Sequence, residues 1–139
     1  MCVLTELEMR ILSELEEGYQ SFPLLMNKVT NRKGTSDEIA AVQGALASLM
    51  ESGLVSIEMS SIPTGFFAIS EQEARREIAE ISEHLTLNAE TGVWKDDREI
   101  GPPYFQIPRP EVVCTDAGYQ EALRILEERG MRWWQEDRP

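Results

Sequence analysis

The sequence contains few of the residues from which most catalytic and metal centres are built. Its 139 residues include two cysteines, Cys2 and Cys114, and one histidine, His84. Two cysteines at opposite ends of a chain define neither a disulfide framework nor a paired-thiol metal site. With one histidine, a Ser-His-Asp triad or an imidazole-rich metal centre has a single candidate. We therefore predict a protein that is not an enzyme, in a reducing compartment, with no metal and no cofactor.

The two local features that could still carry chemistry have simpler explanations. His84 falls near the end of a predicted helix, where a cation is tolerated, so a structural histidine is favoured over a catalytic one. The acidic run Asp96-Asp97-Arg98-Glu99 lacks the Asp-x-Asp-x-Asp-Gly spacing of a calcium loop. A solvated turn is the favoured interpretation of that run.

Positive charge and long apolar runs are also scarce. The chain has 13 Lys+Arg against 25 Asp+Glu, a net charge of −12, which excludes a surface that coats nucleic acid or anionic membranes indiscriminately. Residues 18–36 hold three cations and no acid, so they carry +3 and the remainder −15. No run of about 18 apolar residues and no basic leader occur, so we expect a cytoplasmic protein with no membrane segment.

Capping signals and hydrophobic spacing predict three helices in the first part of the chain. Thr5 to Glu8 form a capping box, which predicts a helix over residues 5–17. Ser21 and Pro23 begin a shorter helix. Thr35 to Glu38 form a second capping box, opening a longer helix whose apolar residues share one face until Gly53.

The rest of the chain mixes strand, helix and loop signals. Loosely alternating apolar residues at 54–59 and the run 66–69, around a Pro/Gly turn, predict a hairpin. Ser70 caps a fourth helix that runs to about residue 85. Glycines and prolines, which interrupt regular secondary structure, predict a loop-rich excursion over 86–112 with at most short strands. A strand at 111–114 and a final helix capped by Thr115 follow.

The order of these elements, and several stretches of sequence, resemble the winged helix-turn-helix domains of MarR and PadR-like bacterial regulators. The matching stretches are residues 4–12, residues 46–55 (LASLMESGLV) and Thr115-Asp116-Ala117-Gly118. The resemblance implies an α+β, mainly α fold, with a three-helix core and a β-hairpin wing at residues 1–70. Residues 71–139 would be a helical extension, containing the excursion and a C-terminal dimerisation helix.

The same resemblance implies a DNA-binding transcriptional regulator whose third helix enters the major groove of double-stranded DNA. Cations and hydroxyls near the start of that helix could hold phosphates, Gln43 could contact adenine and Ser48 could make a weaker contact. The candidate DNA-binding residues are Lys28, Arg32, Lys33, Thr35, Ser36, Gln43 and Ser48. For the three cations alone, a solvated loop is the alternative interpretation.

Two other functions stay open. No Lys or Arg occurs from Thr35 to Val55, so the module could instead bind protein, without DNA, through the small residues Ala40, Gly44 and Ala47. A third interpretation is a small-molecule sensor in which Trp94, Tyr104 and Phe105 form an apolar pocket. No residue identifies its effector.

The C-terminal helix and tail carry large apolar side chains that often find their burial in a partner. Together with the resemblance, they predict a homodimer. The candidate interface residues are Tyr119, Leu123, Leu126, Trp133 and Trp134. Packing of the tryptophans on their own chain is the alternative.

Overall fold

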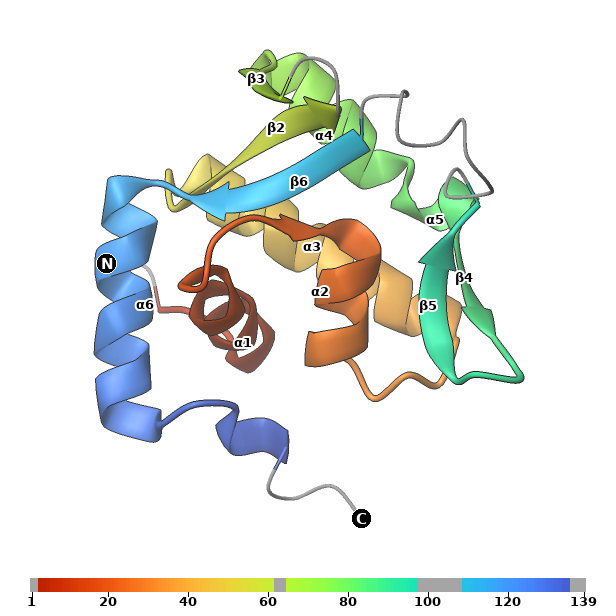
Figure 1. Cartoon of the computed structure of the whole chain (residues 1–139). Helices are drawn as coiled ribbons and strands as arrows, with labels where there is room; N and C mark the ends of the chain where they lie inside the picture. The colour runs from red at the N-terminus through yellow and green to blue at the C-terminus, as the bar shows by residue number, and fades with distance from the viewer. Residues whose placement is uncertain (1–2, 62–64, 98–108, 136–139) are drawn as a thin grey trace.

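Three capped helices begin the chain, as predicted (Figure 1). The computed structural model describes residues 3–61, 65–97 and 109–135. The helices are α1 (Glu6–Leu15), α2 (Phe22–Val29) and α3 (Ser36–Glu51). Their N-caps are Thr5, Ser21 and Thr35, and each hydroxyl accepts a backbone N–H three residues further on. At Thr5 the capping box is complete, since its own N–H donates to Glu8 Oε1 at 3.0 Å.

The predicted fourth helix is interrupted. It divides into α4 (Glu71–Ala79) and the single turn α5 (Ile81–His84). The break lies at Glu80, whose ψ of −4° turns the backbone while Ile78 and Ile81 both stay buried. The last α-helix, α6 (Asp116–Arg129), is capped by Thr115 as predicted. A 3₁₀ turn, η2 (Trp133–Gln135), follows it.

A four-stranded antiparallel sheet takes the place of the isolated hairpin that we predicted. Its strands are β1 (Gln20–Ser21), β2 (Val55–Ser61), β3 (Gly65–Ala68) and β6 (Arg109–Cys114), in the order β1-β6-β2-β3. The β2–β3 hairpin is confirmed. On the other edge of β2, β6 pairs from Val55↔Cys114 to Ser60↔Arg109. The chain therefore leaves the sheet after β3 and returns as its second strand.

The predicted loop-rich excursion contains a second antiparallel hairpin, formed by β4 (Leu85–Asn88) and β5 (Val93–Asp96). The Asn88 side chain holds its turn by accepting the N–H groups of Glu90 and Thr91. These strands are too short to show a clear period in the sequence. Residues 98–108 of the excursion lie outside the described residues.

One hydrophobic core joins the sheet and the helices. Helices α1, α2 and α3 supply half of its buried residues, and the other half includes Val112 of β6, Ile125 of α6 and Trp94 of β5. The boundary predicted at residue 70 lies between β3 and α4, and elements on both sides of it share the sheet and this core. The fold class is α+β and mainly helical, as predicted. No helix within the described ranges is long and apolar enough to cross a membrane.

Candidate functional site

The start of α3 brings together four of the candidate DNA-binding residues. Arg32, Lys33, Thr35 and Ser36 are all exposed there, and neither cation forms an ion pair with any described residue. Lys28 is oriented differently: its Nζ lies 3.9 Å from a carboxylate oxygen of Glu14 in α1 and 3.9 Å from one of Glu17 just after it. The predicted cluster of three cations therefore reduces to two.

The backbone amides beside these cations already bind an anion, which is the carboxylate of Glu38. It accepts the N–H groups of Lys33 at 2.8 Å, Gly34 at 2.9 Å and Asn31 at 3.1 Å. Successive amides arranged in this way form an anion-binding concavity. Because Glu38 occupies it, a phosphate at the start of α3 would be held by side chains rather than by this loop's backbone.

The two candidate base-reading residues of α3 are engaged within the chain. Gln43 Nε2 donates to the carbonyls of Ile78 and Ala79 at the end of α4, both at 3.0 Å. Ser48 Oγ donates to Glu8 Oε2 at 3.1 Å. Helices α4 and α5 also pack against α3, so they cover one side of it. The two side chains that the sequence predicted to contact DNA bases therefore form hydrogen bonds within the chain.

What remains exposed on α3 is small or acidic. Asp37, Ala40, Gly44 and Glu51 lie on its outer face, and α3, all of which the structure describes, carries no cation. Beside that face a groove of about 450 Å³ separates α3 from α4 and α5. Its lining is mostly apolar or small: Gly44, Ala47, Ile78, Ala79, with Gln43, Arg75 and Ser82. The exposed surface of α3 is therefore small and acidic, with an apolar groove beside it.

On α6, two of the candidate interface residues are free of the core. Tyr119 and Leu123 expose 37% and 40% of their surface, whereas Leu126 is half-buried. Helix α6 packs against α1, and its Ala122 and Ile125 are buried. An apolar strip therefore runs along the outer side of the helix.

The tail tryptophans pack against their own chain, which was the alternative interpretation. Trp134 is 5% exposed and its indole N–H donates to the Lys28 carbonyl at 3.0 Å. Trp133 donates to Glu6 Oε1 at 2.8 Å. Burial acts to raise the pKa of Glu6, but hydrogen bonds from Trp133 and Arg129 outweigh it and lower that pKa. The interface role proposed for Trp134 is thus corrected, because intramolecular contacts already bury it.

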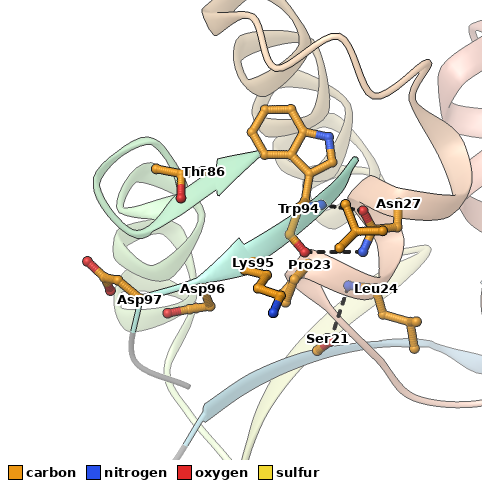
Figure 2. A pocket seen from close by; sticks show the side chains of 10 residues that line it. Ser21, Pro23, Leu24, Asn27, Thr86, Trp94, Lys95, Asp96 and Asp97 are labelled. Atoms are coloured by element: carbon orange, nitrogen blue, oxygen red, sulfur yellow. Dashed lines mark hydrogen bonds between the residues drawn. The ribbon is translucent and has the colours of Figure 1, made fainter. Parts of the chain in front are cut away.

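A pocket of about 770 Å³ lies between α2 and the β4–β5 hairpin (Figure 2). Asn27 of α2 closes one side by bonding both backbone groups of Trp94: its Oδ1 accepts from Trp94 N at 2.6 Å and its Nδ2 donates to Trp94 O. The Trp94 side chain is buried and donates to Thr30 Oγ1. Trp94 is therefore part of the hydrophobic core and also lines this pocket. Tyr104 and Phe105 lie outside the described residues.

On the far side of this pocket, the structure joins the two features that the sequence analysis treated separately. His84 Nδ1 lies 2.9 Å from Asp97 Oδ1, and one donor atom each from His84, Asp96 and Asp97 fall within 4.8 Å of one another. Asp96 is buried. Sequence reasoning missed this group because the pairing of Leu85 with Asp96 in the hairpin, rather than any motif, creates it.

Comparisons of the chain with protein families, with curated proteins and with solved structures return no match.

Proposed function

We propose that the chain is a winged-helix module. The support is topological: α1, β1, α2, α3 and β2 follow in order, and the next long strand of the sheet, β6, lies antiparallel between β1 and β2. In this interpretation β2 and β6 are the two wing strands, in place of the β2–β3 pair expected from sequence. The segment from β3 to β5 is then an insertion at the wing.

We infer that this module binds a protein partner through α3 in preference to reading bases in DNA. The observation that carries this inference is the state of Gln43, whose amide is bonded to two α4 carbonyls while α4 and α5 cover that side of α3. A helix in the major groove needs free donors and is repelled by phosphates if it is acidic. Asp37 and Glu51 make the exposed face of α3 acidic.

The chemistry of this face defines the partner as a helical segment with basic side chains. Small residues at positions 40, 44 and 47 allow a partner helix to approach closely, and the adjoining groove can take an apolar side chain. Asp37 and Glu51 stand near opposite ends of the face, where Lys or Arg of the partner would meet them.

A synthetic amphipathic helix with leucines on one face and lysines at its edges tests this function. The full chain should bind it, and should not bind the same peptide with glutamates in place of lysines. Asp37→Asn combined with Glu51→Gln should weaken binding several-fold, whereas the matched exposed pair Glu90→Gln and Glu127→Gln should not. If both double variants bind the peptide equally well, α3 is not the binding site.

Duplex DNA is the second candidate ligand, and the two exposed cations Arg32 and Lys33 at the start of α3 favour it. Fluorescence anisotropy with a mixed-sequence duplex at about 50 mM salt separates the candidates, because phosphate contacts strengthen as salt falls. If α3 binds a protein partner and not DNA, the chain should not bind this duplex. Salt-dependent binding that Arg32→Ala and Lys33→Ala both weaken would establish the DNA-binding regulator instead.

We further propose a homodimer formed through the outer side of α6. Tyr119 and Leu123 supply an exposed apolar strip, while the ion pairs of Arg124 with Glu121 and Glu128 supply a polar rim. Sedimentation should give a dimer for the full chain and a monomer for Leu123→Glu. Leu24→Glu, at a similarly exposed position on α2, is the matched control and should remain dimeric.

A further inference from the structure

We propose that His84, Asp96 and Asp97 form a binding site for a divalent transition-metal ion of the Zn²⁺ type. The three side chains come from the end of α5, the end of β5 and the residue after it. Their donor atoms lie within 4.8 Å of one another, with His84 Nδ1 and Asp97 Oδ1 2.9 Å apart. This site does not depend on the function proposed for α3.

The donor set identifies the class of ion. Metal–ligand bonds of about 2.0–2.2 Å place neighbouring donor atoms roughly 3.3 Å apart in a tetrahedral site. The His84 and Asp97 donors, 2.9 Å apart, are near that spacing, and the Asp96 donor lies within 4.8 Å of both. Asp97, whose side chain is 55% exposed, can adjust. Imidazole nitrogen suits Zn²⁺, Fe²⁺ or Ni²⁺, whereas Mg²⁺ and Ca²⁺ prefer oxygen ligands alone. One nitrogen with two carboxylates therefore favours a borderline transition metal.

The fold holds these ligands in place without the ion. The backbone N–H of Asp97 donates to the His84 carbonyl at 2.9 Å, which fixes the two residues side by side. Asp96 pairs with the buried Leu85, and the neighbouring Trp94 is bonded through its backbone to Asn27 of α2. Ligands on a rigid, packed hairpin lose little freedom on binding an ion.

The position of the site suggests what the ion would meet. Both carboxylates line the pocket of about 770 Å³, on the opposite side from Leu24 and Asn27 (Figure 2). Lys95 and Thr86 also line this pocket. Three protein ligands leave at least one coordination position of a Zn²⁺ ion to water or to a small anionic solute in this pocket.

Calorimetric titration of the full chain with Zn²⁺ tests the proposal. We expect one saturable site, weakened at least about 10-fold by His84→Gln and by Asp97→Asn, since each removes a ligand. Glu83→Gln, an exposed acid next to His84, is the matched control and should bind as the parent chain does. Cys114→Ser should also bind normally, which excludes thiol ligation.

Thermal unfolding provides a second readout that does not depend on heats of binding. Zn²⁺ should raise the midpoint for the parent chain and both controls, but not for the two ligand variants, because an ion that binds only the folded state stabilises it. The thermal unfolding midpoint measured in the presence of a chelator shows whether each variant folds without the ion. Unchanged affinity in the ligand variants, loss of binding in Cys114→Ser, or no binding by the parent chain would each overturn the site.

Discussion

Two helical glycines should respond in opposite ways to the same substitution. Glycine inside a helix costs about 0.5–1 kcal/mol relative to alanine, so Gly→Ala is normally stabilising where space allows. Gly44 in α3 is exposed, and a Cβ added there meets no atom within 4 Å. Gly118 in α6 is buried, and its Cβ would stand 1.8 Å from the Leu54 carbonyl oxygen and 2.8 Å from the Leu54 carbonyl carbon.

The clash at Gly118 cannot be relieved by a side-chain rotation, because the obstacle is backbone. The start of α6 would have to move by more than about 1 Å, yet it is tied to the same turn. Thr115 N donates to Leu54 O at 3.1 Å and Thr115 Oγ1 donates to Gly53 O at 2.6 Å. Overpacking costs about 1–3 kcal/mol and each strained hydrogen bond about 1 kcal/mol. After the helix-propensity gain, we expect Gly118→Ala to lose about 2–4 kcal/mol.

Urea unfolding of the two variants measures this difference. Gly118→Ala should lower the transition midpoint, and Gly44→Ala should raise it by an amount equivalent to about 0.5–1 kcal/mol. In thermal unfolding, 1 kcal/mol corresponds to a shift of about 4 °C for a domain of this size. If Gly118→Ala proves as stable as the parent chain, α6 does not pack on the Leu54 turn as described, and the reasoning fails.

Three further predictions concern single contacts. Asn27→Ala removes both hydrogen bonds to the Trp94 backbone and should cost about 2–3 kcal/mol, with faster hydrogen exchange at the Trp94 amide. Arg132→Gln removes the guanidinium whose Nε–H is shared between both carboxylate oxygens of the buried Glu14, and it should lower the free energy of unfolding by about 1–3 kcal/mol, less when combined with Glu14→Gln in a double-mutant cycle. Burial, with a smaller effect of Glu16, raises the pKa of the Cys114 thiol to about 11, so at pH 8 its peptide should be alkylated about 100-fold more slowly in the folded than in the unfolded chain.

The helix starts were predictable because their signals are local. At Thr5, Ser21, Thr35, Ser70 and Thr115 a hydroxyl caps an amide three residues away, and every one of these caps is present. Such a bond depends on a few neighbouring residues rather than on the rest of the fold. Sequence therefore locates where helices begin even where it leaves their packing open.

The sheet was less predictable because its pairing is not local. The two residues of β1 are too few to show a period, and β6 pairs with β2 across more than forty intervening residues. A strand signal identifies a strand but not its neighbour. The sequence therefore predicted the β2–β3 hairpin without its neighbour β6, and it predicted at most short strands, with no pairing, where the β4–β5 hairpin and the His84–Asp97 contact form.

The candidate site was less predictable for a different reason: residue type does not reveal whether a polar group already forms a hydrogen bond within the chain. Gln43 and Ser48 have the chemistry of base readers, but their donors are directed to carbonyls of α4 and to Glu8. Glu38 looked like half of a capping box, yet its carboxylate holds the loop amides in front of α3. These hydrogen bonds depend on the folded arrangement of the chain, which the spacing of residues in the sequence does not reveal.

The distribution of ion pairs sets an upper limit on the phosphate contacts that α3 and its loop can make. Lys28, Arg129 and Arg132 all bind carboxylates in or just after α1, so only Arg32 and Lys33 of the loop stay available within the described ranges. Each phosphate contact contributes about −0.9 to the slope of log affinity against log salt. Two cations per chain predict a slope near −2, or near −4 for a dimer that presents both loops. A steeper slope would require other cations, so α3 and its loop would not be the main DNA-binding surface even if the chain binds DNA.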